Sequence, residues 1–276
     1  MKLRKITAFI LILAITVCFF GGCMKKSETK PAPIVVLGPM ECENSTLISK
    51  LDNAEKITVG AYEFTEGEIN GYPVVVVRCL IGMVNSATAT TLAIEKYSPR
   101  CVIIQGTSGG HDPDLHKNDI VLGENLIETG NYQSAHRDEG EGVNVEDWVN
   151  LGEEILVDGE VVRVKTLHSD ETLLSIAKSV EYPYGKVVSG TISSGDIWNR
   201  EIDRIKWWHE TCGSDCEEME GFAVGQVCAQ LGVPFLAIRI LSNSELHPDE
   251  EFDESAGVTC QNYSYDVISA IIIQIG

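Results

Sequence analysis

The stretch CVIIQGTSGG, residues 101–110, decides the fold class of this chain. Its first half is a continuous apolar run, which predicts a strand buried on both faces. Its second half changes abruptly to glycine and small hydroxyl side chains, which let a ligand approach the backbone closely or simply form a tight turn. It is not a phosphate-binding loop, because the Lys-Ser/Thr pair of that motif is missing.

The same pattern, an apolar strand followed by polar or glycine-rich residues, recurs along the chain. Residues 34–37 end in Gly38-Pro39, residues 186–193 in Ser194-Gly195-Asp196, and residues 234–241 in Ser242-Asn243. Further strands are expected at 58–66, 73–80, 119–123 and 161–167, and helices at 43–52, 84–97, 170–180, 217–231 and 255–274. This alternation predicts an α/β fold with a mixed, largely parallel central sheet flanked by helices, and sites at strand ends.

Composition excludes several classes of partner and cofactor. The 276 residues carry a formal net charge of −20, which repels nucleic acids and anionic surfaces, so we expect no nucleic-acid partner. Seven cysteines lie beyond the N-terminal segment, and their scatter favours buried free thiols, although a disulfide between Cys212 and Cys216 stays open. That pair lacks two further ligands at metal-binding spacing, so we expect no metal and no cofactor.

The N-terminus is typical of an exported lipoprotein. A basic start and an apolar run from Ile6 to Phe20 precede Gly21-Gly22-Cys23, which resembles a bacterial lipobox. We therefore expect residues 1–23 to be a signal peptide with Cys23 as the lipid anchor, 24–33 a tether, and 34–276 the functional domain. This predicts attachment to the outer face of a bacterial membrane; an ordinary cleaved signal peptide is the alternative. The acidic stretch 130–160 is expected to be a long loop that caps the pocket, meets a partner or merely decorates the surface.

Two carboxylates are candidates for chemistry. Glu43 follows the first predicted strand, where a carboxylate can act as a base or simply favour a helix N-terminus. Glu220, at the start of a predicted helix, could bind the vicinal hydroxyls of a ribose with charge-assisted hydrogen bonds, or belong to an acidic first turn.

Two further side chains could recognise a planar base. Trp198, just after Ser194-Gly195-Asp196, could stack on such a base, although a lone tryptophan is more often part of a core. Asn243, at the end of an apolar strand, can present a donor and an acceptor to a purine edge, or serve as a turn residue.

Together, these motifs resemble the nucleoside phosphorylase/hydrolase superfamily, specifically the 5′-methylthioadenosine/S-adenosylhomocysteine nucleosidases. The resemblance runs from about residue 34 to the C-terminus. It rests on Gly-x-Met-Glu-x-Glu at 38–43, Ile-Gly at 81–82, Gly-x-x-Gly-Gly at 106–110, Ser-Gly-Asp at 194–196, Glu-Met-Glu at 218–220 and Arg-x-x-Ser at 239–242.

The resemblance implies a purine nucleosidase and assigns roles to residues. Glu43 would activate water, Glu220 would bind the ribose hydroxyls, and Asn243 would take the place of the catalytic aspartate at the purine. The substrate-binding residues implied are Met40, Ile81, Thr107, Ser108, Gly109, Trp198, Asn199, Met219, Arg239, Ser242 and Phe252. Of these, Met40, Ile81 and Phe252 would form the pocket for the 5′-substituent. The family is commonly dimeric, which implies a homodimer.

Asn243 and Asn199 depart from the family pattern. Asparagine cannot donate a proton as an acid does, and related phosphorylases of 6-oxopurines carry asparagine at the place of Asn243. Two alternatives therefore stand beside the nucleosidase: a purine nucleoside phosphorylase or 6-oxopurine nucleosidase, and a nucleoside-binding lipoprotein with weakened catalysis. Water is the favoured nucleophile, because the family's phosphorylases hold phosphate with arginines at places that correspond here to residues 40–43 and 105–107, and neither stretch contains an arginine.

Overall fold

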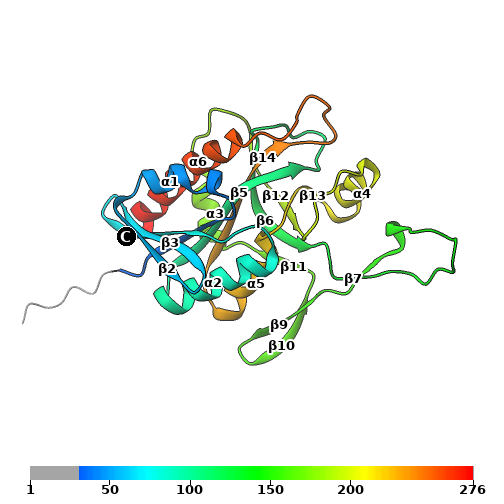
Figure 1. Ribbon diagram of the computed structural model, residues 1–276, viewed down its shortest axis with the longest axis horizontal. Coiled ribbons are helices and arrows are strands. Elements are labelled where there is room, and N and C mark those ends of the chain that lie inside the picture. The colour runs from blue at the N-terminus through cyan, green and yellow to red at the C-terminus, as the bar shows by residue number, and fades with distance from the viewer. Residues whose placement is uncertain (1–30, 276) are drawn as a thin grey trace, which may run out of the picture. The chain divides into compact units, whose positions relative to one another are not determined.

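Strand β1 (Ile34–Gly38) lies inside a mixed sheet of ten strands, between β4 (Tyr72–Arg78) and β5 (Cys101–Gly110), and pairs parallel with both. Figure 1 shows the arrangement of the strands and helices. The computed structural model describes residues 31–275, which form one unit. The signal peptide, the predicted anchor Cys23 and most of the predicted tether lie outside the described residues.

The remaining elements follow in chain order. The other strands of the large sheet are β2 (Asp52–Val59), β3 (Tyr62–Ile69), β6 (Ile120–Glu128), β11 (Thr166–His168), β12 (Val187–Ser194), β13 (Ser214–Glu218) and β14 (Phe235–Asn243). The α-helices are α1 (Ser45–Ser49), α2 (Met83–Tyr97), α3 (Glu171–Lys178), α4 (Ile202–Cys212), α5 (Gly221–Leu231) and α6 (Ser255–Ile275).

The strand pairing closes part of the sheet into a ring. β14 pairs parallel with β5 and antiparallel with β6, while β6, β12 and β13 run parallel and β13 returns antiparallel to β5. The β13–β5 contact is short and pairs Glu217 with Gly109. It therefore places the residues that end β13 beside the glycine-rich end of β5.

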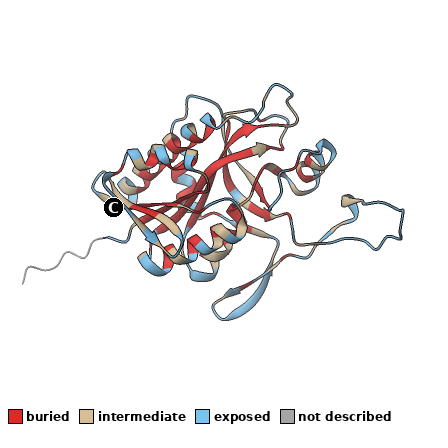
Figure 2. Ribbon diagram, in the orientation of Figure 1, coloured by how far each residue is buried: buried red, intermediate tan, exposed pale blue. Residues whose placement is uncertain are grey.

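Two hydrophobic layers cover the sheet, as the alternation of side chains along a strand requires. Ile34 and Val36 of β1 pack in the cluster that includes residues of α1, α3 and α6, while Val35 and Leu37 pack with α2 and α5. Figure 2 shows the central strands as the buried part of the molecule between these helices. The predicted α/β fold with a central sheet flanked by helices is confirmed.

Three of the predicted elements were wrong in detail. The helix expected at 43–52 is a 3₁₀ turn, η1 (Glu41–Glu43), followed by the short α1, and β2 already begins at Asp52. The strand expected at 58–66 is two strands joined at Gly60, whose φ of 61° favours a tight turn. The helix expected at 217–231 begins only at Gly221, because residues 214–218 form β13 within the sheet.

The stretch 130–160, expected to be irregular, contains paired strands. β7 (Tyr132–Gln133) pairs with β8 (Val149–Asn150), and β9 (Glu153–Val157) forms a hairpin with β10 (Glu160–Val164). Figure 2 shows much of this segment exposed. We call residues 130–164 the arm. β10 falls largely within the strand expected at 161–167, whereas β7 and β8 are only two residues long and β9 begins with two glutamates, which are depleted in strands.

The described cysteines are free, Cys212 and Cys216 included, and five of the seven are buried. The disulfide left open by the sequence is therefore not formed. In the described part of the chain, no helix is both long enough and apolar enough to span a membrane.

Candidate active site

One open cavity gathers most of the candidate residues. The cavity is open to solvent, and its empty space is about 610 Å³ with the open mouth included. Its lining comes from the loop after β1, the end of β5, the loop after β12, the β13–α5 junction and the end of β14. These residues are Pro39, Met40, Glu43, Ile81, Thr107, Ser108, Gly109, Ile197, Trp198, Glu217, Glu218, Met219, Glu220, Arg239, Ser242, Asn243 and Phe252.

Glu43 is fully buried and both of its carboxylate oxygens are held by donors. The backbone N–H and the hydroxyl of Thr107 donate to Oε1 over 2.7 and 2.9 Å, and the N–H of Met40 donates to Oε2 over 2.8 Å. Gly106 is required beside it, because a Cβ there would lie 2.6 Å from Glu43 Oε1. The carboxylate therefore has a fixed position on the cavity wall.

Arg239 forms a buried ion-pair centre in the wall of the cavity. Its guanidinium bonds Glu218 Oε2 and lies 3.1 Å from Glu220 Oε2, and all three side chains are almost fully buried. Burial alone would lower the pKa of Arg239, but the two carboxylates raise it above its usual value. One cation thus compensates two carboxylates in a water-poor environment. Removing these charges from water costs free energy, which the ion pairs offset only if their geometry is good.

The two carboxylates beside Arg239 have different further contacts. Glu218 accepts the N–H groups of Glu220 and Gly221 and so caps the N-terminus of α5, where backbone N–H groups otherwise lack partners. Glu220 accepts the N–H of Gly82 over 2.9 Å and faces the cavity. Burial raises the pKa of Glu220 to about 7, with Glu218 adding to the rise and Arg239 opposing it.

A second polar group lies around Glu217 at another part of the cavity. The backbone N–H of Asn199 donates to Glu217 Oε1 over 2.8 Å, and its side-chain amide donates to Oε2. His111, only 1% exposed, lies with Nε2 3.3 Å from Glu217 Oε2. Asn243 is close by, because a Cβ placed on Gly109 would touch both Asn243 Nδ2, at 3.6 Å, and Glu217 Cγ, at 3.7 Å.

The mouth of the cavity is aromatic and apolar. The rings of Trp198 and Phe252 meet edge to face with centroids 5.7 Å apart, and both remain substantially exposed. Ile81, at the start of the turn before α2, is half-exposed on the same lining. Such a rim offers a stacking surface and an apolar contact to a ligand that enters.

The structure brings together every residue predicted to be catalytic or substrate-binding except Asn199, which bonds Glu217 but does not line the cavity. The predicted lipid anchor Cys23 lies outside the described residues. The roles predicted for these residues stay predictions. Sequence reasoning missed Glu217, Glu218 and His111. The buried carboxylates of the Glu217-Glu218 pair lay within a run interpreted as a helix start, and His111 directly follows the Gly109-Gly110 pair.

Known proteins match this chain over almost the whole described unit. Residues 33–272 match the Phosphorylase superfamily. The 5′-methylthioadenosine/S-adenosylhomocysteine nucleosidases of Tolumonas auensis and Bacillus subtilis are 31% and 33% identical to it, each alignment covering 86% of this chain and 98% or 99% of the relative. The chain belongs to this nucleosidase family.

A solved structure agrees with the sequence comparison. The nucleosidase from Neisseria meningitidis, in complex with methylthio-immucillin-A, superposes with a TM-score of 0.71 at 25% identity. The match covers 87% of this chain and 100% of that one. Membership of the family confirms the resemblance drawn from the sequence, and makes this chain a purine N-ribosyl hydrolase.

Proposed function

We propose that this nucleosidase hydrolyses the N-glycosidic bond of a purine nucleoside with an apolar 5′-substituent, the class to which 5′-methylthioadenosine and S-adenosylhomocysteine belong. The observation that carries the proposal is Glu43, a fully buried carboxylate held on the wall of a cavity whose mouth is apolar. The relatives' own activity, stated in their name, supports the substrate class.

The geometry supports a reaction through an oxocarbenium-like ribose. Departure of the base leaves positive charge on the sugar, which buried carboxylates stabilise electrostatically. Glu220 in its ionised form accepts hydrogen bonds from the ribose hydroxyls, and Met219 beside it packs against the sugar. Glu43 accepts the proton of the water that attacks the anomeric carbon.

Water is a better nucleophile here than phosphate. Of the described residues that line the cavity, Arg239 is the one arginine, and its charge is already compensated by Glu218 and Glu220. A phosphate ion beside Glu43 would meet uncompensated negative charge.

A substrate panel tests the proposal. Purified protein is incubated with methylthioadenosine, S-adenosylhomocysteine, adenosine, inosine and guanosine, with and without phosphate, and free base and sugar are separated by chromatography. We expect release of base and free ribose without phosphate, fastest from the 5′-thio nucleosides. Strict dependence on phosphate would establish a phosphorylase instead.

Asn243 favours a second candidate function, cleavage of 6-oxopurine nucleosides. Its amide lines the cavity, and an N–H donor at that place suits a 6-oxo group. Release from inosine and guanosine but not from the adenine nucleosides would favour this candidate. Binding of nucleosides without release of any base would instead favour a nucleoside-binding lipoprotein.

We also propose that the protein is exported and held at the outer face of a bacterial membrane by lipid on Cys23. The support is the sequence: a basic start, an apolar run of signal-peptide length and Gly21-Gly22 directly before the cysteine. In an expressing bacterium, labelled fatty acid should be incorporated into the wild-type chain and not into Cys23→Ser. Equal labelling of both chains would refute the anchor.

We further propose that the protein forms a homodimer. Its support is exposed apolar surface at the cavity rim, on Ile81 and Phe252, and on the arm, where Val149, Leu156 and Val161 are exposed. Leu156 and Val161 lie opposite each other across the β9–β10 hairpin, so they form an exposed apolar pair that association of two chains would bury. Light scattering should give about twice the mass of one chain, and Leu156→Glu combined with Val161→Glu should give one chain mass. A wild-type monomer would refute it.

A further inference from the structure

We propose that Glu217 and His111 together hold the proton that the departing purine takes up. This inference rests on the proposed function and names a proton donor for it. Asn243 lines the base end of the cavity and has no acidic proton, yet a purine that leaves as an anion is a poor leaving group. A nearby group that can carry a proton is therefore needed.

Glu217 is placed to reach the same ligand atoms as Asn243. Both side chains line the cavity, and both approach the position a Cβ would occupy on Gly109, at 3.7 and 3.6 Å. Glu217 is 9% exposed, so its carboxylate is largely removed from bulk water. The backbone and side chain of Asn199 fix its orientation.

His111 supplies the second half of the pair. Its ring is almost completely buried, its Nδ1 lies 2.9 Å from the hydroxyl of Ser214, and its Nε2 is 3.3 Å from Glu217 Oε2. When Ser214 donates to the carbonyl of Cys216, over 3.2 Å, its hydroxyl must accept from Nδ1–H. Nε2 and Oε2 would then be two facing acceptors, a repulsive arrangement in a buried site unless a proton lies between them.

The bond between the anomeric carbon and the purine nitrogen breaks, and its electron pair goes to the purine. The single proton that the pair shares moves from His111 Nε2 through Glu217 to a ring nitrogen of the purine, which leaves Glu217 ionised and His111 neutral with its proton on Nδ1. Water adds to the anomeric carbon and loses a proton to Glu43. Solvent then reprotonates the pair and takes the proton from Glu43, leaving free base and free ribose.

A leaving-group comparison tests the role of the pair. 4-Nitrophenyl β-D-ribofuranoside releases a stable phenolate that needs no proton, whereas a purine does. Glu217→Gln should lower kcat on the best nucleoside of the panel about 10²–10⁴-fold, the usual contribution of a general acid. The loss on the nitrophenyl riboside should be at least tenfold smaller. His111→Gln should show the same selectivity with a smaller loss.

Two controls separate this inference from its alternatives. Glu210→Gln removes the same charge from an exposed position on α4 and should change neither rate. Glu43→Gln should impair both substrates equally, because water attacks in each case. Equal losses of Glu217→Gln on the two substrates, with unchanged melting temperature, would refute the proton role while leaving the nucleosidase intact. A wild-type protein that releases no base would refute the proposed function itself.

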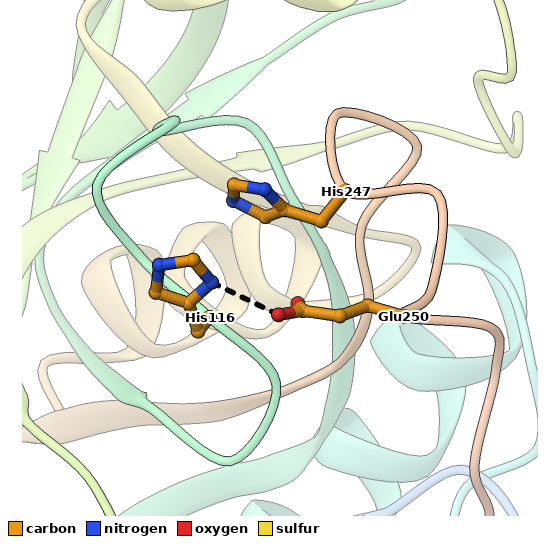
Figure 3. A group of neighbouring side chains, drawn as sticks. All are labelled: His116, His247 and Glu250. Carbon is orange, nitrogen blue, oxygen red and sulfur yellow. Dashed lines mark hydrogen bonds and ion pairs between the residues drawn. The ribbon is translucent and has the colours of Figure 1, made fainter.

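We infer, from an independent observation, a site for a divalent transition metal at His116, His247 and Glu250. Figure 3 shows the three side chains gathered from two loops, between β5 and β6 and between β14 and α6. The two imidazole rings stack with their centroids 4.3 Å apart. One ligand atom from each lies within 4.8 Å of the others. Imidazole with carboxylate is a ligand set typical of zinc.

The surroundings of the three side chains favour a metal ion over a simple surface cluster. His247 Nε2 is buried and has no hydrogen-bond partner among the described residues. Glu250 is already oriented, since its Oε1 lies 2.9 Å from His116 Nδ1 and its Oε2 accepts the N–H of Lys117 over 2.8 Å. Because Phe252 follows Glu250 by two residues, an ion here would fasten the loop that carries one side of the cavity rim.

Zinc titration by calorimetry, with cobalt absorption as a spectroscopic probe, tests this site. We expect one ion per chain, and at least tenfold weaker binding for His247→Ala and for Glu250→Gln. His168→Ala removes an exposed histidine elsewhere and should bind as the wild type does. Absence of binding, or equal affinity in His247→Ala, would refute the site.

Discussion

The two ends of the cavity differ in how their charges are compensated. At one end, Glu218 and Glu220 share the buried cation of Arg239, and Glu43 is held by backbone and hydroxyl donors. At the other, Asn243 brings no charge, and Glu217 is paired with Asn199 and His111. The first end holds the residues that the family resemblance assigns to the sugar and the water; the second is where this chain departs from the family.

The difference teaches that a missing acid need not be replaced at its own position. The first end is a rigid carboxylate cluster that suits a developing positive charge on a sugar. The second offers a base-reading amide beside a separate carboxylate–imidazole pair. Substitutions at the first end should therefore lower the rate on every substrate. Substitutions at the second end should change the rate differently for different leaving groups and different bases.

The largest effect is expected at Glu43. Glu43→Gln keeps the shape of the side chain but removes the base, so kcat should fall about 10²–10⁴-fold on every nucleoside while binding persists. Steady-state rates and equilibrium binding of methylthioadenosine measure this. The matched control is Glu41→Gln in the same 3₁₀ turn, whose side chain is exposed. Full activity of Glu43→Gln would show that the base lies elsewhere.

The second largest effect is expected on the free energy of unfolding, when Arg239 is replaced. Arg239→Met leaves Glu218 and Glu220 buried without their cation, and breaking a buried pair costs about 3–5 kcal/mol. Urea unfolding measures the loss. Arg200→Met, which removes an exposed arginine paired with Glu245, should leave the unfolding midpoint almost unchanged. Equal effects of the two substitutions would contradict the ion-pair centre.

The pH dependence of substrate affinity should report on Glu220. With a pKa of about 7, raised by burial, this carboxyl is protonated below that pH and ionised above it. The ionised form is the better acceptor for ribose hydroxyls, so KM should rise as pH falls below about 7, by up to about tenfold per unit. In Glu220→Gln this rise should vanish. A KM that falls as the pH is lowered would contradict the role of ionised Glu220 in binding the ribose hydroxyls.

One substitution at Asn243 should shift the substrate preference of the enzyme toward adenine nucleosides. Asn243→Asp introduces an acidic group at the purine edge and should raise kcat on adenine nucleosides about tenfold while leaving the nitrophenyl riboside unaffected. Rates on both substrates measure it. No gain on adenine nucleosides would contradict the placement of Asn243 at the purine edge.

The smallest effect is expected at the rim. Trp198 is 55% exposed, so Trp198→Ala should weaken stacking by about 1 kcal/mol and raise KM only several-fold, with kcat unchanged. Tyr184→Ala, which removes another exposed aromatic ring, is the matched control and should leave KM as it was. A large loss of kcat in Trp198→Ala would place this ring in catalysis and not only in binding.

The sequence by itself determined the fold class and most of the cavity lining. Apolar runs such as 34–37 and 101–105 must be buried strands, and polar residues directly after them must gather where those strands end. For this reason Glu43, Thr107 and Asn243 could be grouped from the printed chain alone. The nucleosidase family followed from the same motifs.

Only the tertiary structure revealed β13, the pairing of Glu217 with His111, and the capping of α5 by Glu218. The physical reason is that residues 214–218 are polar and have no strand pattern of their own; they are held in the sheet by pairing with β5 and β12. Contacts between residues more than a hundred positions apart, such as His111 with Glu217 or His116 with Glu250, leave no local signal in the sequence. These contacts form because the closed ring of strands, with the β5–β6 and β14–α6 loops, brings distant segments of the chain together.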